Sequence, residues 1–543
     1  MSLRGGVYRG KEKPQDMKNE QEKYFLPAIL LLALGLRLHF LGFLYPYFEF
    51  NDEVDLVRPA LHILRTGDLN PHFFSYGSFP IYWSTLLFLP ALFVYWLVSG
   101  TGISFHLFLA SFDYQQGGMF LFYLGRLTSV LFGVGSVYLV YRLGKELLDR
   151  RAGWLAALFL AVCPFHIYFS QLYKVDASFL FWFLLVIFFS VRIYREGGWK
   201  NYLGAGLFLG LVLSTRYNFV AFILILSAAL AREGWRGVIR PGLWISAYTT
   251  GMVFLFTCPY AVLDFPNFFE QLRVQMTVNQ QALTFFRTDP GRLFYQHYLY
   301  QLIFLFPAFF GPAVYLCSFP GFWELGKKDR RLGLLLVSYP LIFFVFFSGY
   351  SELVMPQYQI PFLPFAILGG SGWIASALAR KEKVMKGLGW LVLSFSLVFS
   401  LSDLVVPHFK EIYYVYQESG KWVDRNIPKE SKVLSYTWAY PMTNKFGFVH
   451  LTRIYQASKF SFSEFENLDP DYLVLSDTGV LKSPRFTREY REYRKLLDGL
   501  TGGELKSRYR LVQTFAPRPF WEWLAGMIYP DLEGFRICIY QKS

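Results

Sequence analysis

Charged residues are scarce in this chain of 543 residues. Only 17% of the residues are charged, whereas 54% are hydrophobic and 20% aromatic, and the mean hydropathy is +0.30. This composition excludes a soluble multidomain protein and is typical of a polytopic membrane protein. The net charge is +14, but the Lys and Arg residues stand in short clusters between apolar segments. Such clusters set the orientation of a membrane protein and argue against nucleic-acid binding.

Cysteine and the common nucleotide and hydrolase motifs are rare or missing. Of four cysteines, only Cys538 lies outside the apolar segments, so neither a disulfide framework nor a cysteine-based zinc site is indicated. The sequence has no P-loop, no GxGxxG opening a helix after a strand and no GxSxG, which weakens nucleotide-driven transport and serine hydrolysis. No small-residue cleavage site follows the first apolar run, which therefore predicts an anchor and not a removed signal peptide.

Long apolar segments are plentiful. About eleven of them can cross a bilayer of ~30 Å as helices, and we place them at residues 24–44, 119–141, 153–171, 177–194, 200–215, 218–232, 242–262, 297–322, 332–349, 357–379 and 387–407. Basic residues cluster in the loops 142–151, 192–200, 232–240, 327–331 and 380–386. The positive-inside rule predicts that these loops and the tail 1–23 are cytoplasmic. The loop 45–118 is then extracytoplasmic.

Two segments test this topology. Residues 78–98 are apolar enough to span, but a crossing there would place the basic loop 142–151 outside. We therefore predict a juxtamembrane or re-entrant helix, and Pro80, Pro90 and several aromatic residues suit an interface. Residues 200–232 present the reverse case, because a single helix would break the alternation. We divide them at the Ser214–Asn218 segment into two short spans that meet at the outer face.

The C-terminal part has the composition of a soluble domain. Residues 408–543 show helical periodicity over 411–426 and candidate strands at 432–436, 471–476, 508–515 and 535–540. With an odd number of spans, this part is extracytoplasmic. The predicted fold is therefore mainly α: a polytopic bundle over 24–407 with a small extracytoplasmic α/β domain.

The outer loop is unusually rich in charge. Asp52 and Glu53 stand at the start of a helix that we expect to run to about residue 65, and Arg58, His62, Arg65, Asp68 and His72 follow. Asp52, or Asn51 before it, could cap the helix, which is worth about 1 kcal/mol. A helix N-terminus also keeps a carboxylate ionised, as a general base requires. Both roles stay open, whereas Arg65 and Asp68 fit solvated helix and turn residues.

Other ionisable groups occur at the outer ends of the spans. Asp176 has Lys174 two residues before it, which fits either a site or a weak interfacial ion pair. Arg126 lies roughly seven residues inside its span, where an unpaired charge costs several kcal/mol and therefore suggests function. Further candidates, each weak alone, are Arg216, Glu352, Gln357 and Tyr358, whereas Arg37 fits a snorkelling side chain.

The histidines show no metal-ligand spacing. His62, His72, His166 and His297 do not form a motif such as HExxH. A metal would need Asp, Glu and His groups from separate loops, which a sequence cannot show. No metal ligand is assigned, and dependence on a divalent metal stays open.

The order of several short motifs resembles a known family. The motifs are Asp52-Glu53 after the first span, Gly125-Arg126-Leu127, the Arg150–Ala157 run, Pro164 leading to Asp176, Pro259-Tyr260 and Tyr358-x-x-Pro361-x-x-Pro364. Over about residues 24–407 they are similar to the polyprenyl-phosphate-dependent glycosyltransferases of the protein mannosyltransferase and lipid A aminoarabinose transferase type. The C-terminal domain is similar to that of prokaryotic relatives, because it lacks the lectin-like repeats of eukaryotic protein mannosyltransferases.

The resemblance implies a C-type glycosyltransferase fold with an extracytoplasmic site in a cell membrane. The donor would be a sugar on dolichyl or undecaprenyl phosphate, transferred with inversion to a hydroxyl of a glycan, lipid or protein. A carboxylate must then take the acceptor proton, and positive groups must stabilise the departing phosphate.

The resemblance also assigns roles to residues. Asp52 is the expected base, and Glu53 and Asp176 would orient it or hold hydroxyls. The expected phosphate contacts are Arg126, Lys174, Arg216 and Arg58. Gln357 stands where relatives often carry Arg, so that contact would be missing or supplied by Arg216. His72, Tyr358 and Gln357 complete the candidate site residues.

Two other functions compete. A flippase or transporter of lipid-linked glycans would need ionisable groups along a through-pathway, but the cytoplasmic halves of the spans are nearly free of them. A polymerase or ligase would use similar chemistry on a pyrophosphate-linked glycan. The number of sugars added in the product separates this last class from single-sugar transfer.

Overall fold

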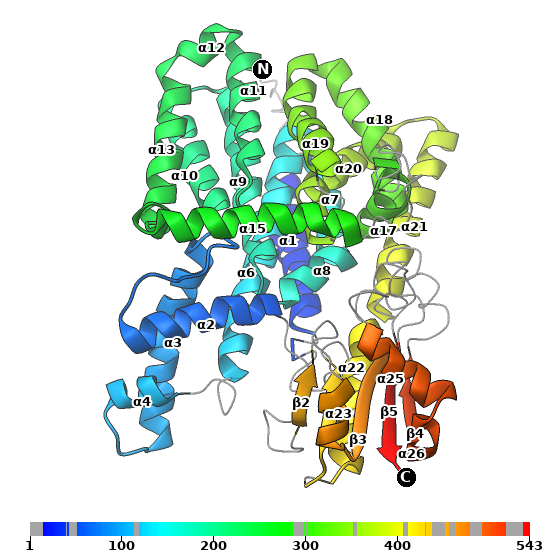
Figure 1. Ribbon diagram of the computed structural model, residues 1–543. Coiled ribbons are helices and arrows are strands. Elements are labelled where there is room, and N and C mark those ends of the chain that lie inside the picture. Colours follow the sequence, from blue (N-terminus) through cyan, green and yellow to red (C-terminus); the bar gives the residue numbers. More distant parts are fainter. Residues whose placement is uncertain are drawn as a thin grey trace, which may run out of the picture.

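The protein consists of a helical bundle with a small mixed sheet at one end (Figure 1). The structure is a computed structural model that describes residues 15–39, 41–42, 51–112, 119–285, 298–299, 301–350, 356–405, 411–428, 430–436, 451–455, 462–477, 491–516 and 536–543. The fold is mainly α, as predicted.

Each predicted span overlaps at least one helix of the bundle, and the predicted spans 153–171 and 297–322 are each divided into shorter helices. The bundle helices are α1 (Gln15–Leu38), α6 (Met119–Leu147), α7 (Arg150–Val162), α8 (Pro164–Gln171), α9 (Val175–Arg195), α10 (Trp199–Thr215), α11 (Phe222–Glu233), α13 (Pro241–Thr257), α17 (Phe306–Phe310), α18 (Pro312–Lys328), α19 (Arg330–Tyr350), α20 (Leu363–Ala379) and α21 (Lys383–Val405). Among the described residues, five helices are long and apolar enough to cross a membrane, or up to seven if each bent pair is one span. This range is below the predicted eleven because several predicted spans form short or bent helices. The chain is a multi-pass integral membrane protein.

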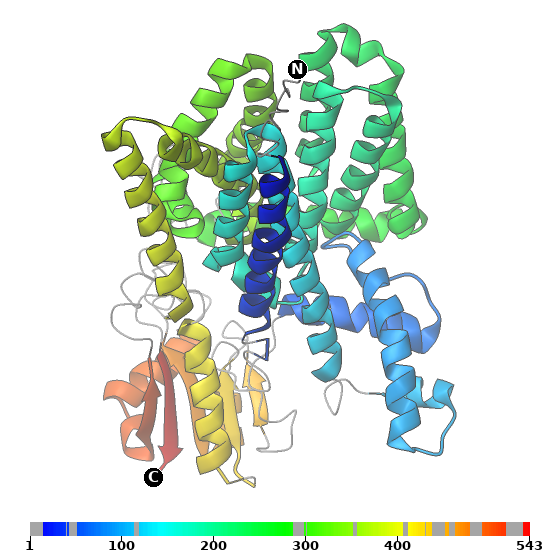
Figure 2. The ribbon, with the colours of Figure 1, turned by 180° about the vertical axis from the view of Figure 1, so that it is seen from behind.

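One of the five candidate spans is α3 (Phe79–Ser99), the segment that we interpreted as juxtamembrane. It extends from the bundle on the same side as the sheet, together with the short helix α4 (Phe105–Ser111), in both views (Figures 1 and 2). Of the most apolar stretch of 18 residues in α3, only 22% is buried within the protein. Its length and composition allow a crossing, so the juxtamembrane interpretation remains a prediction.

A break separates α10 from α11, as predicted from the sequence. The residues after α10 leave the helix, and a short 3₁₀ turn, η1 (Phe219–Ala221), precedes α11. The hydroxyl of Tyr217 donates to the carbonyl oxygens of Phe74 and Tyr76 at 3.1 and 2.8 Å. A Cβ on Gly77 would lie 2.0 Å from the carbonyl oxygen of Ser214, so this close approach requires glycine. The break therefore holds the segment that precedes α3.

The remaining elements of the bundle are shorter or lie across it. They are α2 (Asn51–Thr66), α12 (Arg236–Ile239), α14 (Tyr260–Leu263), α15 (Phe265–Phe285), the π-helix η2 (Gln301–Leu305) and the 3₁₀ helix η3 (Pro356–Phe362). Helices α2 and α15 run across the bundle direction (Figure 1). The side-chain amide of Gln271 on α15 accepts from the Phe74 N–H at 2.7 Å and donates to the His72 carbonyl at 3.1 Å. These bonds hold the loop after α2 against α15.

The C-terminal sheet has the order β2-β1-β3-β5-β4. Its strands are β1 (Val433–Tyr436), β2 (Leu451–Tyr455), β3 (Tyr472–Asp477), β4 (Tyr509–Phe515) and β5 (Arg536–Lys542). β1 is parallel to β2 and β3, whereas β5 is antiparallel to β3 and β4. The helices are α22 (Glu411–Asn426), α23 (Phe462–Leu468), α25 (Arg491–Gly502) and α26 (Leu505–Arg508). The predicted helix and four predicted strands are present, and β2 was not predicted.

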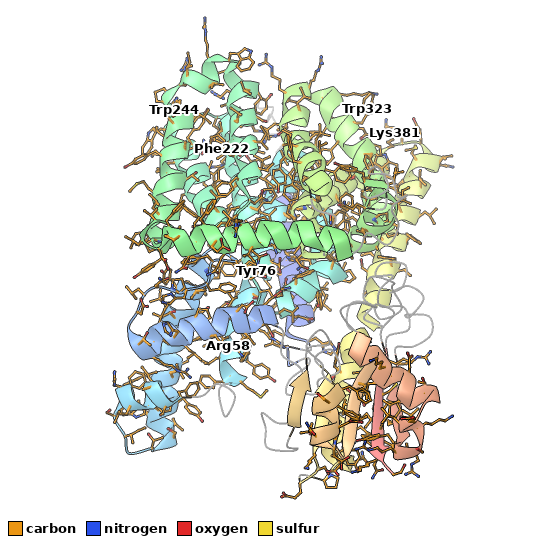
Figure 3. All side chains as sticks on the ribbon, in the orientation of Figure 1. Arg58, Tyr76, Phe222, Trp244, Trp323 and Lys381 are labelled. Carbon is orange, nitrogen blue, oxygen red and sulfur yellow. The ribbon has the colours of Figure 1, made fainter. Side chains whose placement is uncertain are left out.

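The two ends of the bundle differ in the residues they carry. Trp323 and Lys381 lie at the end away from the sheet, whereas Arg58 and Tyr76 lie toward the sheet (Figure 3). The turn between α18 and α19 and the helix α12, which carry basic clusters, are also at the end away from the sheet (Figure 1). This distribution agrees with the predicted topology. The side of the membrane that each end faces remains a prediction.

Candidate active site

Helix α2 positions the two adjacent carboxylates at its first turn. One face of α2 is buried against α3 and neighbouring helices through Val54, Val57 and Leu61, while Arg58 and His62 are exposed. This amphipathic pattern lets the helix lie across the end of the bundle and not traverse it. Asp52 and Glu53 therefore begin at one end of the bundle, as the sequence predicted.

Glu53 is fully buried and bonded to Arg126 of α6. Arg126 Nε and Nη2 donate to the two carboxylate oxygens at 2.7 and 2.8 Å, and both side chains are 0% exposed. Nη1 of Arg126 also donates to the Leu41 carbonyl at 2.8 Å, and the Tyr173 N–H donates to Glu53 Oε1 at 2.7 Å. Such a bidentate pair is strong and directional. It attaches the start of α2 to α6 and to the residues just before α9.

Asp52 points to a second, more open group of charges. Lys174 Nζ lies 2.5 Å from Asp52 Oδ2 and 3.9 Å from Asp176 Oδ2. Arg216 Nη2 lies 2.9 Å from Asp176 Oδ1. Asp52 is 30% exposed, whereas Lys174 is 9% exposed and Asp176 is buried. Four predicted site residues thus form a continuous chain of alternating charge, which we call the Asp52–Arg216 chain.

The four residues come from three segments that are far apart in the sequence, and folding brings these segments together. Lys174 is the N-cap residue of α9 and Asp176 lies in its first turn, where the helix dipole favours a carboxylate. Arg216 follows α10 at the break, and its guanidinium lies 5.7 Å from the ring centres of Phe179 and Tyr358. The first turns of α2 and α9 and the residue after α10 therefore meet at one place.

Gln357 and Tyr358 border this chain of charges. Arg216 Nη1 donates to the main-chain carbonyl of Gln357 at 3.0 Å. Tyr358 is placed near Arg216 by the ring contact described above. The backbone carbonyl of Gln357 therefore contacts the arginine, so this contact does not require the glutamine side chain.

Tyr76 and Asp55 border the same chain, and sequence reasoning missed both. Burial raises the pKa of Tyr76, with contributions from Asp52 and Asp176, against the opposing effect of Arg216. Burial and the neighbouring Asp52 raise the pKa of Asp55 to about 6, which Arg58 partly opposes. Asp55 follows Asp52 by three residues on one helix, a spacing that could have indicated it. Tyr76 gave no such signal in an aromatic loop.

Other predicted residues lie apart from the chain of charges. Arg58 is exposed on α2 and interacts electrostatically with Asp55. His72 lies 2.9 Å from Asp68, beyond the other end of α2. Arg37 is fully buried and donates to the Ala33, Leu160 and Ala161 carbonyls. The snorkelling interpretation of Arg37 was wrong, because carbonyl acceptors inside the bundle satisfy its guanidinium.

A metal does not fit between the two carboxylates of this chain. The ammonium group of Lys174 contacts both Asp52 and Asp176 and already supplies positive charge there. A dication at the same place would meet a nearby ammonium of like sign. We therefore derive no step through a metal at Asp52 and Asp176.

Comparisons with known proteins agree with the fold. Residues 119–260 match the family model described as dolichyl-phosphate-mannose-protein mannosyltransferase. No curated protein matches the chain. The fold is similar to that of AglB, an archaeal oligosaccharyltransferase from Archaeoglobus fulgidus, whose structure was solved in complex with an inhibitory peptide and a dolichol-phosphate. The TM-score is 0.50 and the sequence identity 12%, and the alignment covers 92% of this chain and 75% of AglB. It also resembles ArnT from Cupriavidus metallidurans bound to undecaprenyl phosphate, with TM-score 0.47, 12% identity and coverage of 97% and 98%.

The helical bundle, its small C-terminal sheet and the likeness to AglB define a multi-pass membrane protein with the C-type glycosyltransferase fold. The family match covers residues 119–260, and this part of the chain is similar to glycosyltransferases of the dolichyl-phosphate-mannose-protein mannosyltransferase family. The matched residues include Arg126, Lys174, Asp176 and Arg216, whereas Asp52 and Glu53 precede them. The resemblance inferred from the motifs is confirmed.

Proposed function

We propose that this protein transfers a sugar from a polyprenyl phosphate to an acceptor hydroxyl, with inversion, at the extracytoplasmic end of the bundle. The single observation that supports it best is the Asp52–Arg216 chain. A partly exposed carboxylate lies beside a lysine and, through Asp176, an arginine. This arrangement supplies a base and a cationic region in one place.

Asp52 is the proposed general base. Its carboxylate is the more exposed of the adjacent pair, and the ammonium group of Lys174 lies 2.5 Å from it. An acceptor hydroxyl would give its proton to Asp52 while its oxygen forms the new bond to the anomeric carbon. The bond from that carbon to the phosphate oxygen breaks on the opposite face, so the configuration inverts. The products are a glycoside and a polyprenyl phosphate.

Lys174 and Arg216 are the proposed groups that stabilise the departing phosphate. Arg can donate to two phosphate oxygens at once, and Arg216 is oriented by Asp176 and by the Gln357 carbonyl. Tyr76, which is partly buried beside the same charges, would supply a further hydroxyl to donor or acceptor. In this proposal Asp176 positions the two cations and does not itself take the proton.

A cavity of about 20 Å³ lies beside Lys174, which is room for about one water molecule. It is lined by Leu56, Phe79, Pro80, Trp83, Thr128, Ser129, Phe132, Tyr173, Lys174 and Ser178. Most of these side chains are apolar, and they come from α2, α3, α6 and α9 with the residues just before it.

Glu53 and Arg126 take a different part in this proposal. Both are fully buried and bonded to each other, so we assign them to holding α2, and with it Asp52, in position. The earlier expectation placed Glu53 among the catalytic carboxylates and Arg126 at the phosphate. Their burial favours a positioning role for both.

The test is transfer by purified protein in liposomes, with a radiolabelled sugar on undecaprenyl phosphate. Asp52→Asn keeps the size of the side chain but removes the base, and should lower the transfer rate by about 10²- to 10⁴-fold. Asp498→Asn, an exposed position on α25, is the matched control and should transfer normally. Full activity of Asp52→Asn in a correctly inserted protein would reject Asp52 as base. Labelled lipid that changes leaflet without a covalent product would instead support a flippase.

A further inference from the structure

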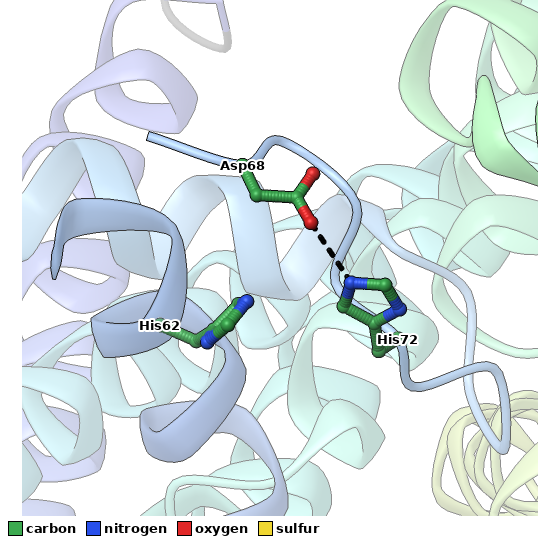
Figure 4. A group of neighbouring side chains, drawn as sticks. All are labelled: His62, Asp68 and His72. Carbon is green, nitrogen blue, oxygen red and sulfur yellow. Dashed lines mark hydrogen bonds and ion pairs between the residues drawn. The ribbon is translucent and has the colours of Figure 1, made fainter. Parts of the chain in front are cut away.

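A separate group of metal-binding side chains lies beyond the other end of α2. His62, Asp68 and His72 each offer one ligand atom, and these atoms all lie within 4.8 Å of one another. The two imidazoles and the carboxylate face one another across a small space (Figure 4). His72 Nε2 is 2.9 Å from Asp68 Oδ2, and the two histidine rings are 5.6 Å apart at 75°. Among the residues that the structure describes, this is the group that could hold a metal ion.

We propose that His62, Asp68 and His72 form a zinc site on the outer side of the protein. Two imidazole nitrogens and one carboxylate oxygen are a donor set that zinc prefers, whereas magnesium prefers oxygen ligands alone. All three side chains are exposed, so the ion can enter from solvent and water can complete four-coordination. The ion would replace the direct contact between His72 and Asp68 by bonds from both to the metal.

The loop that carries two of the ligands is held by its own hydrogen bonds. Asp68 Oδ1 accepts from the Asn70 N–H at 2.9 Å, and Asn70 Oδ1 accepts from the His72 N–H at 3.0 Å. The amide nitrogen of Asn70 donates to Asp264 at 2.7 Å, which attaches the loop to the residue between α14 and α15. Groups that fix the ligands in this way raise the affinity of metal sites.

The proposed zinc site is distinct from the active site. His62 lies ten residues after Asp52 on α2, which is about 15 Å along the helix at about 1.5 Å per residue. Zinc would join the C-terminal part of α2 to the segment that leads to Tyr76 and α3. Its expected effect is to stabilise α2 and the loop between α2 and α3. The inference does not depend on the proposed transfer reaction.

The test is zinc binding to the full chain, purified in detergent with a tag that contains no histidine. After treatment with EDTA and dialysis, the protein is titrated with zinc against a chromogenic chelator, and bound zinc is measured by elemental analysis. The wild-type chain should bind about one zinc per chain. His62→Gln and His72→Gln should each weaken binding about tenfold or more. Zinc should raise the melting temperature of the wild type but not of these variants, and magnesium should not replace it.

His106→Gln is the matched control. His106 is an exposed histidine on α4 in the same outer region, and its replacement should leave zinc binding unchanged. Size-exclusion profiles of all variants report folding independently of metal. Zinc retained at wild-type affinity by both His62→Gln and His72→Gln would overturn the proposal. So would a wild-type chain that binds no zinc at micromolar concentration, or one that binds magnesium as tightly as zinc.

Discussion

Two carboxylates that are adjacent in the sequence lie in opposite environments. Glu53 is fully buried and bonded to Arg126, whereas Asp52 is 30% exposed and lies 2.5 Å from Lys174. Successive residues on a helix point about 100° apart, so one turns into the bundle and the other toward its open end. The Asp-Glu pair therefore consists of two residues in different environments, and we propose that Glu53 holds the helix while Asp52 acts as the base.

The largest expected effect is on stability and tests the buried pair of Glu53 and Arg126. Replacing Glu53 or Arg126 with Gln leaves the partner charge buried without its counterion, and should destabilise the protein by about 3–5 kcal/mol. The double variant should be no less stable than either single variant, because the two losses are shared. Melting temperatures in detergent, measured for all three variants, give this coupling.

A surface ion pair provides the control for that measurement. Arg273 and Glu270 on α15 form an exposed ion pair at 3.0 Å, and breaking such a pair changes stability by about 1 kcal/mol or less. Arg273→Gln should therefore leave the melting temperature nearly unchanged. Additive effects of Glu53→Gln and Arg126→Gln would show that the buried pair does not act as a unit.

A smaller expected effect is on lipid binding and tests Lys174, which lies beside the more exposed carboxylate of Asp52. Lys174→Met removes the ammonium group but keeps most of the apolar stem, and should weaken binding of undecaprenyl phosphate about 10- to 100-fold. Fluorescence competition with a labelled polyprenyl phosphate measures this affinity directly, without relying on transfer. Because Lys174 also contacts Asp52, the transfer rate of this variant would fall for two reasons and is the poorer measure.

The control for Lys174 lies at the other end of the bundle. Lys327 is exposed near the end of α18, and Lys327→Met should bind the lipid phosphate normally. Arg216→Gln, in contrast, should weaken binding as Lys174→Met does. Unchanged affinity in both Lys174→Met and Arg216→Gln would assign the phosphate to other groups.

The sequence allowed the helical class and the positions of most bundle helices to be predicted, but eleven spans were predicted where five to seven candidate spans are found. The charged residues assigned to the site remain a prediction. Asp52 and Glu53 could be found because charge is rare next to an apolar segment, and Lys174 and Asp176 for the same reason. The different environments of Asp52 and Glu53 could not be predicted, since the hydrogen bond between Glu53 and Arg126 joins residues 73 positions apart. Contacts at that separation depend on how α2 packs against α6.

The grouping of the two histidines with Asp68 could not be predicted from the sequence either. His62 and His72 have no recognisable ligand spacing, and only the turn after α2 brings them together with Asp68. Tyr76 reaches the site because Tyr217 and Gly77 hold its loop against the break after α10. These are tertiary contacts between a loop and a helix end, and no periodic pattern in the sequence encodes them.

The smallest expected effect concerns Asp55, which lies between the two environments. Its pKa is raised to about 6 by burial and by Asp52, so its ionised form is less favourable in the folded chain than in the unfolded chain, where the pKa is near 3.8. Stability therefore falls as pH rises from about 4 to 6 and stays lower above that range. Asp55→Asn removes this penalty and should stabilise the protein by about 1 kcal/mol at pH 7.5, after allowance for solvent screening. The gain should shrink toward zero as pH approaches 4, which melting curves at several pH values can measure. Asp498→Asn serves as control, and a gain that is equal at pH 4 and 7.5 would show that Asp55 is not held in a strained ionised state.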